Sequence, residues 1–193
     1  MNIERVFEIF RETGVMLDGH FLFTSGRHGD KYMQCAQLFR FPQYTDEILE
    51  DLAKRFEGEQ IDLVIGPAVG AVQMSFAMAR ILGCENIFAE RENGAMTLRR
   101  GFHIEPGQKV LVVEDVVTTG GSVQEVLELV HKAGGDVVGV CVVVDRTNGQ
   151  IDLGERLESV VSLDLKSYAP DECPLCKEGI PLVKPGSRNL PIK

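Results

Sequence analysis

The chain has 193 residues and a formal net charge of -9 at pH 7, and this length suits one domain over residues 1–193. The acidic balance argues against a nucleic-acid-binding surface, and no apolar run approaches the roughly 20 residues that span a bilayer. Because the N-terminus lacks the regions of a signal peptide, we expect a cytoplasmic protein without nucleic-acid or membrane partners. The five cysteines, an odd number, argue against a disulfide framework.

The first third of the chain is expected to form a helix, a hairpin and a second helix. Apolar residues at helical spacing predict a helix over residues 3 to about 12, and Gly14 ends it. Two short strands, at residues 21–23 and 31–34, flank a polar turn. The next helix, over residues 45 to about 56, begins at side chains that suit a helix cap.

Strands and helices alternate through the rest of the chain. The expected elements are, in order, a strand at 63–65, a helix at 72–82, strands at 87–89 and 109–113, a helix at 122–133, and strands at 137–144 and 160–163. This alternation predicts an α/β fold with a mostly parallel central sheet flanked by helices. Ligands bind such sheets at the carboxyl ends of their strands. Residues 169–193 hold five prolines and are expected to be extended and irregular.

Two adjacent carboxylates, Glu114 and Asp115, lie between the strand at residues 109–113 and a hydroxyl- and glycine-rich turn at residues 118–122. Backbone N–H groups at the start of a helix form a phosphate cradle, and glycines let the backbone come close to the anion. Neighbouring carboxylates need a shared cation or hydroxyl groups that donate to them. A ribose that carries phosphates supplies both. The alternative is an ordinary strand–turn–helix of an α/β protein.

This run resembles the 5-phosphoribosyl-1-diphosphate (PRPP) signature of type I phosphoribosyltransferases. The resemblance implies that family's fold, with a small N-terminal hood formed mainly by residues 14–40 and part of the C-terminal tail. It also implies that the two acids bind the ribose hydroxyls, that Asp115 is catalytic, and that Mg²⁺ is bound mainly through PRPP and diphosphate. The PRPP-binding residues that it implies are Glu114, Asp115, Val116, Val117, Thr118, Thr119, Gly120, Gly121 and Ser122.

A second loop of small residues, at 66–70, follows a predicted strand and allows close approach to its backbone. In the resembled family a short loop at this place contacts the diphosphate. Some relatives have a lysine at the position that aligns with Gly70, so this chain offers the diphosphate fewer cations there. A simple strand-to-helix turn is the alternative.

The polar turn near the N-terminus is similar to the hood that closes over the base in orotate phosphoribosyltransferases. The resemblance assigns Arg27 and Tyr32 to the orotate site, and Tyr32 with Met33 aligns with a pair that packs against the base. For Arg27 and Lys31 the alternative is a solvated hairpin.

Arg146 follows Asp145 at the end of the long apolar strand. The planar guanidinium group suits a carboxylate, which orotate has and which adenine, guanine, hypoxanthine and uracil lack. In orotate phosphoribosyltransferases the matching arginine binds orotate, as does the threonine that aligns with Thr118. The alternative is an Asp145–Arg146 pair at the strand end.

Residues 90–101 are charged and contain glycine, which fits a mobile loop. Arg91 matches the first arginine of a loop that closes over the diphosphate in the resembled family, usually from the neighbouring subunit of a dimer. That loop has lysines and a histidine soon after its arginine, whereas this chain has Glu92 and then Arg99 and Arg100. The resemblance makes Arg91 and Arg99 catalytic candidates and Arg91 a PRPP ligand. A solvated hairpin is the alternative.

A single CxxC motif, Cys173 to Cys176, lies in the C-terminal tail. A structural zinc site normally needs a second pair of ligands, so the motif is interpreted as a turn with free thiols and no metal site is assigned. A dimer could supply the second pair across its two-fold axis.

Together the motifs imply transfer of the phosphoribosyl group from PRPP to orotate in pyrimidine (UMP) biosynthesis, by a homodimer that exchanges loops between its subunits. Two alternatives stay open. The chain could use another base, or it could be a PRPP-sensing regulator that has lost catalysis, although such a regulator would normally carry a DNA-binding extension.

Overall fold

The centre of the protein is a six-stranded sheet in the order β5-β4-β3-β6-β7-β8, in a computed structural model that describes residues 1–23, 25–163 and 165–185. Its strands are β3 (Leu63–Pro67), β4 (Glu85–Glu92), β5 (Ala95–Leu98), β6 (Lys109–Val117), β7 (Asp136–Asp145) and β8 (Leu157–Ser162). Every neighbouring pair is parallel except β4 and β5. The expected α/β fold with a mostly parallel sheet is therefore confirmed.

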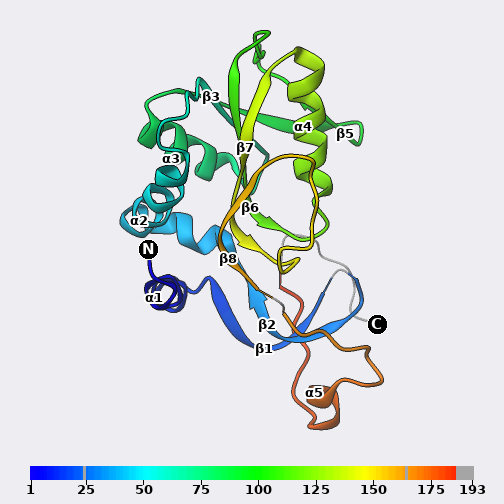
Figure 1. Cartoon of the computed structure of the whole chain (residues 1–193). Coiled ribbons are helices and arrows are strands. Elements are labelled where there is room, and N and C mark those ends of the chain that lie inside the picture. Colours follow the sequence, from blue (N-terminus) through cyan, green and yellow to red (C-terminus); the bar gives the residue numbers. More distant parts are fainter. Residues whose placement is uncertain (24, 164, 186–193) are drawn as a thin grey trace.

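Helices cover both faces of this sheet (Figure 1). They are α1 (Ile3–Thr13), α2 (Pro42–Ala53), α3 (Val72–Leu82) and α4 (Gly121–Ala133). Side chains alternate along β6, so Leu111 and Val113 pack with α2 and α3, whereas Val110 and Val112 pack with α4. Burial on both faces explains why the central strands are almost wholly apolar.

The first hairpin forms a separate two-stranded sheet of β1 (Met16–Leu22) and β2 (His28–Met33) at one end of the molecule (Figure 1). The C-terminal segment runs along both of its strands. Leu22 N donates to Val183 O at 2.8 Å, and Tyr168 and His28 exchange backbone hydrogen bonds of 2.8 and 2.9 Å. The short helix α5 (Pro174–Lys177) lies in the same segment.

Several boundaries differ from the predicted ones. β1 begins at Met16, five residues early, through a polar stretch that contains a register irregularity. A 3-10 helix, η1 (Cys35–Arg40), precedes α2, and α2 begins at Pro42 and continues into a second 3-10 helix, η2 (Lys54–Phe56). Pro42 occupies the first helical position, where the missing N–H costs nothing.

The segment predicted as a loop at residues 90–101 is instead largely an antiparallel hairpin of β4 and β5. This was the alternative interpretation of the segment. Its turn, Asn93-Gly94, has φ values of 52° and 87°, which is the left-handed backbone that tight hairpin turns require.

Within the described ranges, no helix is both long enough and apolar enough to cross a membrane.

Candidate active site

The loops that follow β3, β6 and β7 meet at the carboxyl edge of the sheet. Val117 on β6 pairs with Asp145 on β7, and Arg146 N donates to Val117 O at 2.9 Å, so Thr118 and Arg146 lie side by side. The loop after β3 approaches β6 closely, because a Cβ atom on Gly70 in this loop would lie 3.1 Å from Asp115 Oδ1 on β6. The sheet therefore brings together three motifs that are far apart in the sequence.

The turn from β6 into α4 encloses a small cavity of about 60 Å³, lined by Glu114, Val116, Val117, Thr118, Thr119, Gly120, Gly121, Ser122 and Val123. Gly120 is the N-cap of α4 at φ 76°, and no side chain caps the helix there. The first amides of α4 are thus left for a ligand, and a helix N-terminus favours an anion. All of the predicted PRPP residues in this run except Asp115 line the cavity.

Glu114 and Asp115 are both largely removed from solvent, and each influences the pKa of the other. Glu114 is 8% exposed. Burial first, and then the neighbouring charge of Asp115, raise the pKa of Glu114 well above the usual carboxyl range. Burial also raises the pKa of Asp115, although its Oδ1 accepts a 2.8 Å hydrogen bond from Val116 N. Among the described residues, no lysine or arginine forms an ion pair with either acid.

Asp115 lies on the side of the loop after β3. A Cβ atom on Gly70 would be 3.1 Å from Asp115 Oδ1. Position 70, which the sequence analysis aligned with a lysine of some relatives, therefore lies against Asp115. Glycine at this position leaves room beside the Asp115 carboxylate. Carboxylate oxygens are the ligands that Mg²⁺ prefers, so Glu114 and Asp115 fit a magnesium ion shared with a phosphate ligand.

Arg146 carries an unsatisfied donor at this edge. Its Nε is buried and has no hydrogen-bond partner in the described part of the chain. The guanidinium carbon lies 5.2 Å from the centroid of the Phe23 ring, and burial lowers the pKa of Arg146. A cavity of about 390 Å³ is lined by Arg146 together with Thr118, Thr119, Thr147, Asn148, Gln150 and Ile151.

The alternative interpretation, an Asp145–Arg146 pair, is wrong. Asp145 accepts hydrogen bonds from Thr147, Gly149 and Ser162 at 2.6–2.8 Å, and these satisfy both of its oxygens. Arg146 is thereby left available to a ligand.

Of the two hairpin residues predicted for the orotate site, Tyr32 lies near Arg146 and Asp115, whereas Arg27 bonds the segment around Ser167. Tyr32 is half-buried, and this burial raises the pKa of its phenol. The positive charge of Arg146 lowers this pKa by less than burial raises it, and the negative charge of Asp115 also raises it. Arg27 instead donates to Ser167, from Nε to Oγ at 2.8 Å and from a terminal nitrogen to the carbonyl oxygen at 2.6 Å. The Thr24 position of this turn lies outside the described residues.

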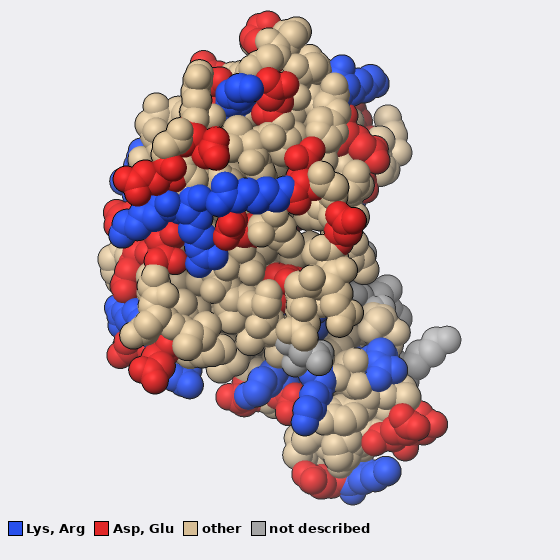
Figure 2. All heavy atoms as spheres, in the orientation of Figure 1, with Lys and Arg blue, Asp and Glu red and all other residues tan. Residues whose placement is uncertain are grey.

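The arginines of the β4–β5 hairpin are paired with carboxylates. Arg91 bonds Glu125 Oε1 on α4 at 2.7 Å and Gly94 O at 2.9 Å, and Arg99 pairs with Glu92 at 3.4 Å. Figure 2 shows the same intermixing of cations and carboxylates over one face of the molecule. The fold thus does not bring Arg91 or Arg99 to the acid pair within one chain.

The model of the phosphoribosyl transferase domain matches residues 35–164 of this chain. Among curated relatives, the orotate phosphoribosyltransferase of Pelotomaculum thermopropionicum is 56% identical over 98% of this chain and 100% of its own length. That of Thermotoga maritima is 53% identical over 95% of this chain and 98% of its own.

Solved structures give the same family. The orotate phosphoribosyltransferase of Aeropyrum pernix has a TM-score of 0.71 at 26% identity, covering 81% of this chain and 92% of that one. The Mycobacterium tuberculosis orotate phosphoribosyltransferase in complex with inorganic phosphate has a TM-score of 0.66 at 25% identity, covering 84% and 97%.

Proposed function

The chain belongs to the phosphoribosyltransferase family, and we infer that within this family it is an orotate phosphoribosyltransferase. It transfers the 5-phosphoribosyl group of PRPP to orotate, which gives orotidine 5′-monophosphate and diphosphate in pyrimidine biosynthesis. Relatives of that name that are more than half identical along nearly the whole chain support the assignment.

The observation that favours orotate over another base is the buried Nε of Arg146 beside Thr118, which no described residue pairs with. A buried donor without a partner costs about 1–3 kcal/mol, more when it is charged, so a ligand that accepts from it is strongly favoured. Orotate offers a carboxylate to the guanidinium group, and the phenol of Tyr32 is near enough to be influenced by the charge of Arg146. Purines and uracil have no carboxylate and would leave Arg146 unsatisfied.

PRPP binds at the acid pair and the turn that follows it. The 5-phosphate accepts hydrogen bonds from the turn at residues 118–122 and the first amides of α4. The ribose hydroxyls donate to Glu114 and Asp115, and these donors lower the raised pKa values of the two carboxyls. When bound with PRPP, Mg²⁺ would neutralise charge on the diphosphate, and Glu114 and Asp115 are the residues that could contribute ligands to it.

Catalysis is then a matter of position and charge. The C1–diphosphate bond loosens early, so the sugar gains oxocarbenium character and needs no nucleophilic side chain. Orotate held by Arg146 lies next to the C1 atom of a ribose fixed by Asp115, which removes much of the entropic cost of the encounter. Arg91 and Arg99 stabilise charge on the leaving diphosphate after exchanging their carboxylate partners for it.

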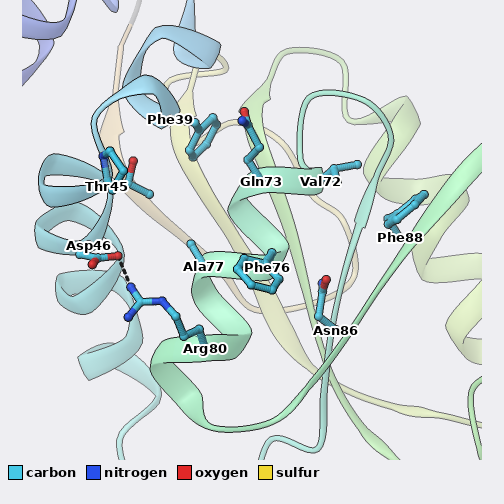
Figure 3. A pocket seen from close by; sticks show the side chains of 11 residues that line it. Phe39, Thr45, Asp46, Val72, Gln73, Phe76, Ala77, Arg80, Asn86 and Phe88 are labelled. Carbon is cyan, nitrogen blue, oxygen red and sulfur yellow. Dashed lines mark hydrogen bonds and ion pairs between the residues drawn. The ribbon is translucent and has the colours of Figure 1, made fainter.

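These arginines act on the neighbouring subunit of a homodimer. A largely apolar groove with a volume of about 600 Å³ runs along α3, between α2 and β4 (Figure 3). The residues around it are Phe39, Pro42, Thr45, Asp46, Val72, Gln73, Phe76, Ala77, Arg80, Asn86 and Phe88. Phe76 is 63% exposed there, and Val69 on the adjoining loop is 86% exposed. A second copy that covers this surface would bury both side chains beside the loop after β3.

The experiment is a turnover assay with PRPP and magnesium. Loss of orotate absorbance follows the reaction with orotate, and release of diphosphate follows parallel reactions with uracil, hypoxanthine and adenine. We expect turnover with orotate alone. Turnover with a purine but not with orotate would assign the chain to another base. Tight PRPP binding without turnover of any base would make it a regulator.

A further inference from the structure

Four potential metal ligands from two distant parts of the chain converge beside the first hairpin. His20 lies on β1 and His28 on β2, while Cys173 is the N-cap of α5 and Cys176 lies within it. One ligand atom from each residue lies within 4.8 Å of all the others. The CxxC motif therefore finds its second pair of ligands within the same chain, and the pair consists of histidines.

The distances match a tetrahedral ion. His20 Nε2 and His28 Nδ1 are 3.1 Å apart, and the sulfur-to-nitrogen distances are 3.5 Å for Cys173 and 3.2 and 3.7 Å for Cys176. Zinc bonds of about 2.0 Å to nitrogen and 2.3 Å to sulfur in tetrahedral geometry separate two nitrogens by about 3.3 Å and a nitrogen from a sulfur by about 3.6 Å.

A second layer of contacts orients one of the ligands. His20 Nδ1 lies 2.7 Å from Ile180 O. A carbonyl oxygen only accepts, so Nδ1 carries the proton and Nε2 presents its lone pair to the cluster. Metal-bound histidines characteristically donate their other N–H to such a group.

Three of the four side chains are buried. His20 and His28 are 2% and 6% exposed, and Cys173 is fully buried, whereas Cys176 is exposed and gives an ion a route of entry. Buried imidazole and thiol groups that face one another are poorly matched as hydrogen-bonding partners, because the imidazole lone pairs meet only weak S–H donors. A cation at the centre would satisfy all four.

We propose that His20, His28, Cys173 and Cys176 form a structural zinc site. Two thiolates and two neutral imidazoles neutralise Zn²⁺, and binding releases one proton from each thiol. Sulfur and nitrogen ligands in tetrahedral arrangement select zinc over the hard, oxygen-seeking Mg²⁺ of the substrate. The ion fastens the C-terminal segment to the hairpin that carries Tyr32.

The test begins with the full chain, purified with a thiol reductant, loaded with zinc and then freed of excess metal on a desalting column. Metal analysis should find one zinc per chain in the wild type and in Cys84→Ser, a control at a half-buried cysteine on another part of the fold. Cys173→Ser and His20→Ala should each lose most of the zinc, with circular dichroism to verify that the variants are folded.

A second measurement does not depend on any variant. Wild-type protein in which cobalt replaces zinc should show the intense visible bands of tetrahedral Co²⁺ and near-ultraviolet charge transfer from thiolate. Weak octahedral bands, the absence of stoichiometric metal, or equal zinc in Cys84→Ser and folded Cys173→Ser would overturn the site. A Cys173–Cys176 disulfide in metal-free protein, two hydrogens lighter and still unable to take up zinc after reduction, would overturn it as well.

Discussion

We propose that base specificity depends on Arg146, because its buried Nε has no hydrogen-bond partner among the described residues. Arg146→Ala should lower kcat/KM for orotate, with a loss of transition-state stabilisation of about 2 kcal/mol or more, since it removes a charged hydrogen-bonded contact from a desolvated site. The KM for PRPP should change little. Steady-state kinetics with each substrate varied in turn measure the split.

Arg156→Ala is the matched control. Arg156 precedes β8, so it lies at the amino ends of the strands, away from Arg146, and it packs over Phe56. It should leave both substrates unaffected. Equal losses toward orotate and PRPP in Arg146→Ala would remove Arg146 from the base site.

Glu114 gives the substrate-free protein a pH-dependent stability. Its folded pKa is raised above the unfolded value, so the folded chain holds this proton more tightly. The associated stability is fully present below the ordinary carboxyl value of 4.5 and is lost as the pH rises through the raised pKa. Glu114→Gln, which does not ionise, should flatten the fall of Tm between the unfolded pKa of 4.5 and the folded pKa of about 9.

Thermal unfolding of the wild type, Glu114→Gln and the exposed-site control Glu57→Gln across that pH range checks this. The control should follow the wild type. A Glu114→Gln curve parallel to both would mean that Glu114 carries no such penalty.

At the residue level, the sequence predicts what is contiguous or lies at strand ends. Glu114 and the turn at residues 118–122 are neighbours in the chain, and Arg146 and Thr118 meet because both follow adjacent parallel strands. The partners of Arg27 and Arg91 could not be predicted, since Ser167 and Glu125 lie on other elements. His20 and His28 were missed for the same reason, and their only signal was two histidines in the predicted hairpin region.

The turn into α4 depends on glycine at position 120. Its φ of 76° is unfavourable for other residues, and a Cβ atom there would lie 2.4 Å from Ile151 Cδ1. Gly120→Ala should therefore distort the turn at residues 118–122 and destabilise the protein by about 1–2 kcal/mol through backbone strain alone. If this turn holds the 5-phosphate, as we propose, the substitution should also raise the KM for PRPP.

Gly107→Ala is the control that separates backbone strain from a steric clash of the added Cβ atom. Gly107 has almost the same φ, 77°, but no atom within 4 Å of an added Cβ. It should cost similar stability and leave the KM for PRPP unchanged. A KM raised equally by both substitutions would show that the turn at Gly120 does not hold the phosphate.

Whole elements were predicted best where a glycine ends them. α1, α3 and α4 end at Gly14, Gly83 and Gly134, each in the left-handed conformation. The β4–β5 hairpin was only the alternative interpretation although Asn93-Gly94 is a strong turn signal, because the charge of the segment and the family resemblance favoured a loop. The early start of β1 depends on pairing with β2, which the polar residues 18–20 do not indicate.

At the scale of the whole molecule, the groove beside Phe76 predicts a dimer. Phe76→Glu places a charge where an apolar ring would be buried between subunits, and it should shift the protein from dimer to monomer in sedimentation or light scattering. Activity should fall with the dimer fraction, because the hairpin arginines then lose the site on which they act.

Ile3→Glu is the control, since Ile3 is 51% exposed on α1, outside the groove. It should stay dimeric and active. A Phe76→Glu protein that remains a fully active dimer would place the subunit contact elsewhere.

The proposed roles of the acid pair and of the turn after it depend most on where PRPP binds. A crystal structure with PRPP and magnesium tests this directly, and it should show the 5-phosphate within the turn at residues 118–122 and the ribose hydroxyls on Glu114 and Asp115. A donor bound elsewhere, or a ribose that contacts neither acid, would contradict it.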